Sequence, residues 1–595
     1  MVNAEQPDPP SASGRMALHR SQKLNLLRLA VLLTVALAGI KFFFRDSFTL
    51  DQRREVSGES HFWGNAQQDM KQPGNTQARS VGHLDRQAAA GAPGPELKKL
   101  PHRDFSSMQM RLVHLDLKGA APKVSYLEQI FPLFSKMGAN GVLVEYEDMF
   151  PFQGELEILR SPYAYSEEDI TKIQELADLN KLEIIPLVQT FGHVEMKSSN
   201  ISCVEETQFI LKHEKYRHLR EVERFPNSFN PHLPETLALL KALLTQVLSR
   251  HPHSSWVHIG ADEVFHLGEG LDSKNWMSRN GGDAGKMYLN HIREVVQFIA
   301  SQPWGQQVLL WDDMLRKVGV AAIQDSGIAK HTSPVLWFYA PDFDTQQIGR
   351  YIEKYAECGF STIWFASAFK GTTGPAQAWT PLNTHLQNHL RWLKVIQSME
   401  KTPSIRFQGI VLTGWQRYDH YSALCELLPV GIPSLAVCLQ TLVNGGFTDA
   451  AKKKVLAILG FQNLHLEKNT CEGTGAFPGA DIYRLVEQVD GQLKDSVSKV
   501  LEDESSIKGW FSPYHRKHQF GNPRNMESFG SKVLKVHEEW ESIIQTLRSH
   551  MENIYFPDTV EEWMEENVNP HMDHLREFVR DFKEVIRLNA RPKTL

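Results

Sequence analysis

Two adjacent carboxylates, Asp262 and Glu263, directly follow an apolar run over 257–261. The β-branched residues of this run predict a strand, which would carry the two acids to the rim of a fold. Successive residues of a strand point to opposite faces, so the two side chains would take different roles. For an isolated pair of acids, the ordinary alternative is a strand end that faces water or caps the next helix.

Around these acids, short β-rich runs alternate with stretches of helical periodicity. Between the first two runs, for example, apolar residues recur at helical spacing at Ile130, Phe131 and Phe134. This alternation is typical of parallel strands joined by crossover helices. Eight such runs predict an α/β fold, a closed (β/α)8 TIM barrel, with strands at 110–117, 141–147, 183–189, 255–260, 307–311, 334–338, 362–366 and 408–413.

The active site of such a barrel lies at the carboxyl ends of its strands. The predicted strand ends are rich in carboxylates and tryptophans. A pyranose site needs both, because the sugar's apolar face stacks on indole and its hydroxyls form charge-assisted hydrogen bonds. Beside Asp262 and Glu263, the candidate site residues at these ends are Asp116, His193, Trp311, Trp337, Tyr339, Trp415, Tyr418 and Asp419.

Several motifs, in one order along the chain, carry a resemblance to a known family. The block His-Ile-Gly-Ala-Asp-Glu over 258–263 resembles the His-x-Gly-x-Asp-Glu signature of glycoside hydrolase family 20, the β-N-acetylhexosaminidases. The stretches over 111–119, 189–193 and 413–419 resemble the hexosaminidase D branch in particular. The resemblance covers roughly 108–445 and implies hydrolysis of terminal, non-reducing N-acetylhexosamine residues of a glycan or glycoconjugate.

The mechanism of such a hydrolysis constrains the two acids. The leaving oxygen must be protonated, and the positive charge at the anomeric carbon must be stabilised or captured. Adjacent residues of one strand do not readily lie on opposite faces of a sugar, so a direct double displacement is strained. The resemblance implies substrate assistance, in which the 2-acetamido oxygen attacks the anomeric carbon. Glu263 would then be the general acid and base, and Asp262 would hold the acetamido N–H.

The resemblance also implies roles for the other candidates. His193 would support the acid pair, although a structural histidine is an equal alternative. Trp311, Trp337 and Trp415 would form pocket walls, for which the alternative is core packing. Asp116 and Asp419 would contact sugar hydroxyls, and Tyr339 or Tyr418 would donate to the acetamido oxygen.

The sequence departs from the family pattern in two places. Lys118 stands where many relatives use an arginine, and a lysine lacks the planar fork that grips sugar hydroxyls, so the preference between sugar epimers stays open. Many relatives also have a small α/β domain before the barrel, whereas the corresponding region here is low in complexity.

The amino-terminal region predicts a membrane segment. An apolar run within 29–45 follows a basic tail over 1–28, which favours a type II signal anchor with the following chain in the lumen of the secretory pathway. A cleaved signal peptide is the competing interpretation, because small residues stand at Ala36 and Ala38. Anchor-less relatives of the hexosaminidase D branch suggest a cytoplasmic or nuclear location instead. The sequon at Asn200 predicts glycosylation only in the lumen.

The rest of the chain completes the domain plan. Residues 46–105, rich in Gln, Gly, Pro and Ser, predict a disordered stem. The catalytic barrel is expected over 106–445, and a helical carboxyl-terminal region over 446–595, most simply a scaffold.

Composition excludes some classes of protein. The formal net charge of −6, from 70 acidic and 64 basic residues, gives no sign of a nucleic-acid partner. The five scattered cysteines match no metal-ligand spacing, and acid–base catalysis needs neither a metal nor a cofactor. The remaining alternative to a hydrolase is a catalytically inactive barrel that binds glycans or proteins. The oligomeric state is not predicted.

Overall fold

The computed structural model describes residues 109–195, 211, 214–502 and 505–593, together with the backbone at 197–198 and 208–209. All of these residues belong to one unit that spans 95–595. The predicted tail, anchor and stem, and the sequon at Asn200, lie outside the described residues. Within the described ranges, no helix is both long and apolar enough to cross a membrane.

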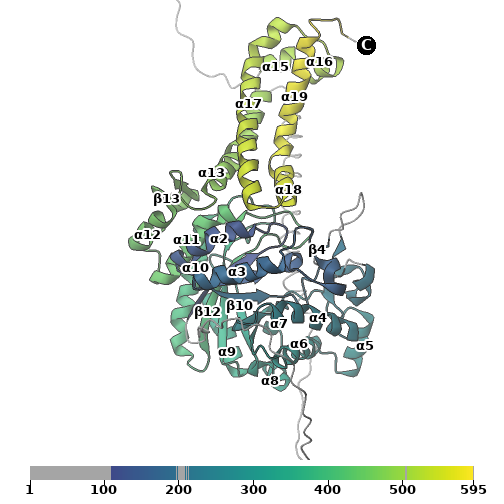
Figure 1. The fold of residues 1–595 in the computed structure, drawn as a ribbon, viewed down its shortest axis with the longest axis vertical. Helices are drawn as coiled ribbons and strands as arrows, with labels where there is room; N and C mark the ends of the chain where they lie inside the picture. Colours follow the sequence, from purple (N-terminus) through teal and green to yellow (C-terminus); the bar gives the residue numbers. More distant parts are fainter. Residues whose placement is uncertain are drawn as a thin grey trace, which may run out of the picture. The chain divides into compact units, whose positions relative to one another are not determined.

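Eight parallel strands form a closed barrel, as predicted (Figure 1). Neighbouring strands follow the order β1-β12-β11-β10-β9-β8-β3-β2 around it. Seven of the eight predicted runs overlap their strands closely, whereas the fourth strand is shorter than expected. The barrel strands are β1 (Met110–Asp116), β2 (Gly141–Glu145), β3 (Glu183–Leu187), β8 (Trp256–His258), β9 (Gln307–Trp311), β10 (Thr332–Trp337), β11 (Thr362–Lys370) and β12 (Arg406–Gly414).

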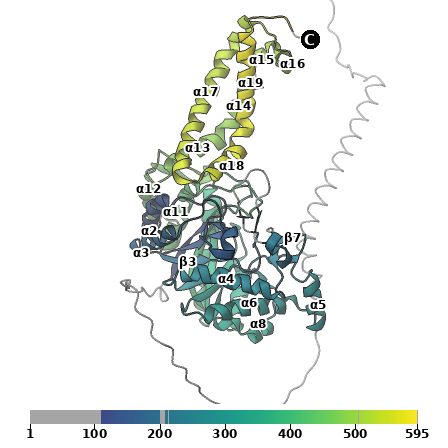
Figure 2. The same cartoon turned by 45° about the vertical axis from the view of Figure 1, so that its right-hand side comes forward.

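Helices cover the outside of the barrel (Figures 1 and 2). Helix α3 shows how local sequence sets a boundary: the Ser166 hydroxyl accepts the Asp169 N–H, and the Asp169 carboxylate accepts the Ser166 N–H. The helices associated with the barrel are α2 (Val124–Met137), α3 (Glu167–Leu179), α4 (Pro234–Ser249), α5 (Leu271–Arg279), α6 (Ala284–Ala300), α7 (Asp313–Arg316), α8 (Val320–Ser326), α9 (Thr345–Glu357), α10 (Leu382–Ser398) and α11 (Leu428–Asn444).

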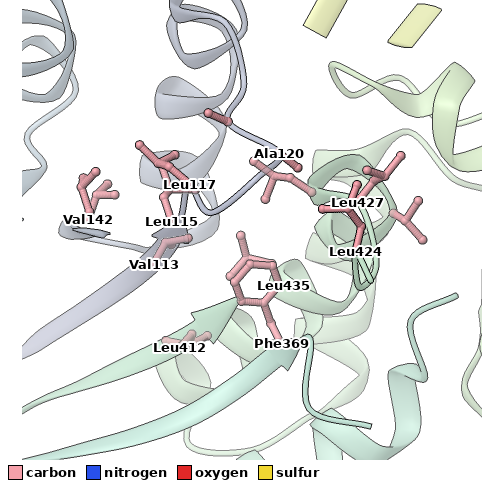
Figure 3. Close-up of a cluster of buried hydrophobic side chains, with 14 of the residues drawn as sticks. Val113, Leu115, Leu117, Ala120, Val142, Phe369, Leu412, Leu424, Leu427 and Leu435 are labelled. Atoms are coloured by element: carbon pink, nitrogen blue, oxygen red, sulfur yellow. The ribbon is translucent and has the colours of Figure 1, made fainter. Parts of the chain in front are cut away.

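The strands bury two separate apolar layers, because alternate residues point to opposite faces. In β1, Leu112 belongs to the core inside the barrel, while Val113 and Leu115 pack outward against the helices (Figure 3). The inner core contains Trp256 and Trp364, whose ring centroids are 5.5 Å apart in an edge-to-face arrangement. Trp364 is therefore a packing residue.

Between β3 and β8 lie two short antiparallel pairs, β4 (Lys197–Ser198) with β5 (Gln208–Phe209) and β6 (Arg220–Val222) with β7 (Phe225–Phe229). After α11 the chain is mainly helical, as the periodicity predicts, apart from an unforeseen hairpin of β13 (Asn463–His465) and β14 (Thr470–Glu472). The helices of this region are α12 (Asp449–Leu459), α13 (Ala480–Gln488), α14 (Lys494–Leu501), α15 (Ser505–Trp510), α16 (Pro513–His518), α17 (Pro523–Ile554), α18 (Pro557–Asn567) and α19 (Asn569–Arg587). The predicted domain boundaries stay predictions.

Candidate active site

The two predicted catalytic acids lie in a loop after β8 rather than on the strand. The strand ends at His258, and Gly260, Ala261 and Glu263 then adopt left-handed backbone conformations with φ of 62°, 64° and 44°. The expectation that strand alternation separates the two acids is therefore wrong, since left-handed residues interrupt an extended chain. A left-handed Ala and Glu carry strain that the surroundings must hold in place, as is frequent at active sites.

Contacts from neighbouring elements hold this acid loop, which we define as residues 260–263. The Tyr288 hydroxyl donates to the Ala261 carbonyl at 2.9 Å, and the Glu263 N–H donates to Asp313 Oδ2 at 3.0 Å. Gly192 packs on the loop from the other side, where an added Cβ would lie only 2.1 Å from the Asp262 carbonyl oxygen. A glycine is needed there, because any side chain would push the two loops apart.

His193 contacts both acids from the loop after β3. Its Nε2 lies 3.1 Å from Glu263 Oε2 and 3.7 Å from Asp262 Oδ2. On the far side of the ring, Nδ1 lies 3.7 Å from Oε1 of the buried Glu195. His193 is thus enclosed by three carboxylates. A histidine that supports the acid pair, the role expected for His193, would have such surroundings.

Burial and mutual charge shift the pKa values of this group. Burial raises the pKa of Asp262 to about 7, with help from Asp313 and Glu263 and against the attraction of His193. Burial alone would lower the pKa of His193, but Asp262, Glu195 and Glu263 together raise it well above its usual value. These three carboxylates therefore favour the charged form of His193.

Asp313 belongs to the same site, although the sequence reasoning did not select it. Its Oδ2 accepts the Glu263 N–H, and its Oδ1 accepts Trp337 Nε1 at 3.3 Å. Burial raises the pKa of Asp313 to about 6. The sequence feature that could have identified Asp313 is its position just after the end of β9, in the run Trp311, Asp312, Asp313.

A cavity of about 340 Å³ opens at the carboxyl ends of the strands, and the acid loop forms part of its wall. Nine of the ten predicted site residues line it. They are His193, Asp262, Glu263, Trp311, Trp337, Tyr339, Trp415, Tyr418 and Asp419. The cavity is also lined by seven residues that the sequence did not predict as site residues, namely Lys118, Gln189, Asn227, Phe265, Gly371, Thr372 and Arg417.

Aromatic rings form much of this wall. Trp311 and Trp415 have ring centroids 6.0 Å apart, and Trp337 stacks on Tyr339 at 5.3 Å. The Trp415 indole N–H donates to the Tyr339 hydroxyl oxygen at 3.2 Å, which orients the tyrosine. Burial raises the pKa of Tyr339, so its hydroxyl keeps its proton and stays a donor. Tyr418, in contrast, is 44% exposed.

Asp116 is the predicted site residue that does not line the cavity. Its Oδ1 accepts the Lys118 N–H at 3.0 Å, and its Oδ2 accepts the Gln416 N–H at 2.8 Å. The carboxylate thereby joins the loop after β1 to the loop after β12. Its position fits the support of these loops and gives no support to the predicted contact with a sugar hydroxyl.

Lys118 connects the cavity to a group of buried charges below it. Its Nζ lies 3.9 Å from Glu145 Oε1 and 3.7 Å from Glu147 Oε1, and His114 Nε2 lies 3.0 Å from Glu145 Oε2. Burial alone would raise the pKa of Glu145, but Lys118 and His114 hold it below its usual value. Burial raises the pKa of Glu147 well above its usual value, against the attraction of Lys118.

A family model and two relatives identify the family of this chain. Residues 130–363 match the catalytic domain of glycosyl hydrolase family 20. The chain is 48% identical over 477 residues to hexosaminidase D of Homo sapiens, which covers 80% of this chain and 95% of that protein. The chain belongs to glycosyl hydrolase family 20.

Further relatives accompany this match. Hexosaminidase D of Bos taurus is 51% identical over 355 residues, which cover 60% of this chain and 98% of that protein. The match with the solved structure of Flavobacterium johnsoniae chitobiase has 14% sequence identity and a TM-score of 0.44. It covers 80% of this chain and 72% of the chitobiase chain. The family resemblance of the 258–263 block is thus confirmed, while the roles of individual site residues stay predictions.

The described part of the chain contains no group of three or more His, Cys, Asp and Glu residues placed to hold a metal ion.

Proposed function

We propose that the cavity hydrolyses terminal, non-reducing β-linked N-acetylhexosamine residues, and that the substrate's own 2-acetamido oxygen is the nucleophile. The family membership and the two hexosaminidase D relatives support the β-N-acetylhexosaminidase activity. The acetamido oxygen would displace the leaving group with retention of configuration after a second displacement by water.

The observation that carries this proposal is that Asp262 and Glu263 share one partner. Both carboxylates lie within 3.7 Å of Nε2 of His193. A protein nucleophile and a general acid must instead approach the sugar from opposite sides. Two acids gathered around one imidazole nitrogen fit a pair that acts on one side, which leaves the nucleophile to the substrate.

The free acceptor on Asp262 fits the acetamido group. Asp262 Oδ1 is buried and has no hydrogen-bond partner among the described residues. An acetamido N–H placed against this oxygen would gain a charge-assisted bond and would leave the acetamido oxygen free to attack. We assign Asp262 to orienting this group and to stabilising the cation that forms.

Glu263 is placed to exchange protons with the leaving group and then with water. Its side chain is 38% exposed, in contrast to the buried Asp262, so it reaches the open side of the cavity. His193 and Asp313 hold it from both ends, through Oε2 and the backbone N–H. A carboxyl group fixed in this way is a suitable general acid and base.

Release of a chromophore from aryl N-acetyl-β-glucosaminide and N-acetyl-β-galactosaminide by the full-length chain tests this function. We expect cleavage of at least one substrate by the native chain and almost none by Glu263→Gln. If neither is cleaved, while glycan binding is the same in the native chain and in Glu263→Gln, the inactive binding barrel is the better account.

We also propose that residues 29–45 anchor the chain as a type II membrane protein with the barrel in the lumen of the secretory pathway. The apolar run and the basic flank of the sequence support this topology. In sealed microsomes, we expect the carboxyl terminus to resist protease, and Asn200→Gln to abolish an endoglycosidase-sensitive mass shift. Full digestion without detergent would instead support a cytoplasmic or nuclear location.

A further inference from the structure

A residue of the carboxyl-terminal helices holds a side chain of the active-site wall. Arg417 lines the cavity, and its guanidinium pairs with Glu562 of α18 through two bonds. The Nη1–Oε1 distance is 2.8 Å, and the Nη2–Oε2 distance is 2.6 Å. Such a two-pronged pair fixes the orientation of the guanidinium as well as its charge.

The same guanidinium connects two loops that supply cavity residues. Its Nε donates to the Lys118 carbonyl oxygen at 3.2 Å, and its Nη1 donates to the Ser422 carbonyl oxygen at 2.6 Å. Gly119 makes room for it, because an added Cβ would lie 2.2 Å from Nη2. Arg417 therefore links Lys118 on one loop to the 415–422 segment on the other, in addition to the link that Asp116 makes between the same loops.

Helix α18 and the residues before it are attached to the barrel at the same place. Thr559 Oγ1 donates to the Gly119 carbonyl oxygen at 3.0 Å, and the Leu428 N–H donates to the Tyr555 hydroxyl oxygen at 3.1 Å. The Lys123 N–H donates to the Ile554 carbonyl oxygen at 2.7 Å. These bonds attach the segment that carries Glu562 to the barrel.

Buried apolar residues lie beside these loops. Figure 3 shows Leu117 and Ala120, which follow β1, near Leu424 and Leu427, which precede α11. The loop backbones are thus supported by buried apolar side chains and by Asp116, and Arg417 adds a link between them that extends to Glu562.

We propose that Glu562 is a positioning residue of the active site: through Arg417 it sets the spacing between Lys118 and the wall of Trp415, Tyr418 and Asp419 that grips the sugar. This inference rests on the proposed function. It gives the carboxyl-terminal helices a part in substrate binding, beyond the scaffold role expected from the sequence.

Kinetics of Glu562→Gln in the full-length chain test the proposal. We expect KM for the aryl N-acetylhexosaminide to rise about tenfold and kcat to change less than about threefold, because the binding wall is displaced and the acids are not. Glu562→Asp should restore part of the loss, since it keeps the charge. An unchanged KM in both variants would overturn the proposal.

The neighbouring Glu561 provides a matched control. It lies on the same helix, its side chain is exposed, and its carboxylate pairs with Arg548 of α17 at 2.5 Å. Glu561→Gln removes one carboxylate charge of α18, as Glu562→Gln does, and should leave KM unchanged. An equal rise in KM for both variants would show a general effect of helix charge and would contradict the positioning role.

A double-mutant cycle with Arg417→Lys identifies the path of the effect. If Glu562 acts through Arg417, the double variant should raise KM no more than the larger single variant. If the KM increases of the two single variants multiply in the double variant, Glu562 acts by another route, and the proposal is overturned. Should Glu562→Gln not fold, Glu562→Asp carries the same cycle with a smaller expected effect.

Hydrogen exchange separates this inference from the proposed function. In Glu562→Gln, amides over 416–424 should exchange faster than in the native chain, while those of β8 and the acid loop stay unchanged. This readout needs no substrate, so an inactive native chain would overturn the function without hiding the positioning effect. Unchanged exchange over 416–424 would overturn the positioning role even in an active enzyme.

Discussion

Two neighbouring strands, β8 and β9, are each followed by a pair of adjacent acids, and the two pairs have different surroundings. Asp262 and Glu263 both line the cavity. Asp312 is turned away from it: its Oδ2 accepts Arg316 Nε at 2.7 Å and the Tyr355 hydroxyl at 2.9 Å. The second member, Asp313, instead supports the first pair through the Glu263 N–H.

The difference lies in how each charge is balanced. Arg316 pairs with Asp312, and the Tyr355 hydroxyl donates to the same carboxylate, so Asp312 is part of a structural ion pair. Asp262 shares His193 with Glu195 and Glu263, whereas Asp313 accepts the uncharged Glu263 N–H and Trp337 Nε1. Burial raises the pKa of both Asp262 and Asp313. Acids whose negative charge is only partly balanced by neighbouring cations are the ones that are available for chemistry.

Glu263→Gln should have the largest effect on catalysis. The amide cannot exchange protons with the leaving group, so we expect kcat to fall by about a thousandfold or more while the melting temperature changes little. Steady-state kinetics and thermal unfolding on the same preparation measure both quantities. A kcat within tenfold of the native value would assign the acid role to another residue.

Asp262→Asn should lower kcat by about a hundredfold, less than Glu263→Gln. The amide can no longer accept the acetamido N–H with a full charge, and it no longer stabilises the cation. Substrates with a 2-hydroxyl in place of the 2-acetamido group provide the control, since their slow cleavage should depend on Asp262 only through the cation and should therefore fall much less. An equal loss for both substrate types would contradict the orienting role.

Asp312→Asn and Asp313→Asn should separate stability from catalysis. Loss of Asp312 leaves Arg316 without its buried partner, which should reduce the free energy of unfolding by about 3 kcal/mol while the folded enzyme keeps most of its kcat. Loss of Asp313 removes a support of Glu263 and should lower kcat about tenfold, with a smaller change in stability. Denaturant unfolding and steady-state kinetics of both variants measure these effects. The comparison would be wrong if Asp312→Asn lowered kcat more than Asp313→Asn, and if Asp313→Asn lost more stability than Asp312→Asn.

The pH dependence should reflect the raised pKa of Asp262. The ionised form accepts the N–H, and a raised pKa means that this form is lost as the pH falls through about 7 rather than through the ordinary range near 4. We therefore expect kcat/KM to decrease on the acid side from about pH 7 downward. In Asp262→Asn, the residual activity should lose this acid limb, and a retained limb would assign it to another group.

The sequence predicted the barrel because its strands are local β-rich runs, and it predicted the cavity because residues that end parallel strands meet at one face. It did not predict that the acid loop leaves the strand at His258, since left-handed Ala261 and Glu263 depend on contacts from Tyr288 and Asp313. The pairing of Arg417 with Glu562 was also beyond reach, because 145 residues separate the two along the chain.

Hydrolysis of aryl N-acetyl-β-hexosaminides whose acetyl group carries zero, one, two or three fluorines tests the central claim most directly. Fluorine withdraws electrons from the acetamido oxygen without changing the position of the sugar. If this oxygen is the nucleophile beside Asp262 and Glu263, kcat/KM should fall steeply with each fluorine. A rate that does not depend on the number of fluorines would show that the protein or water supplies the nucleophile, and would contradict the account.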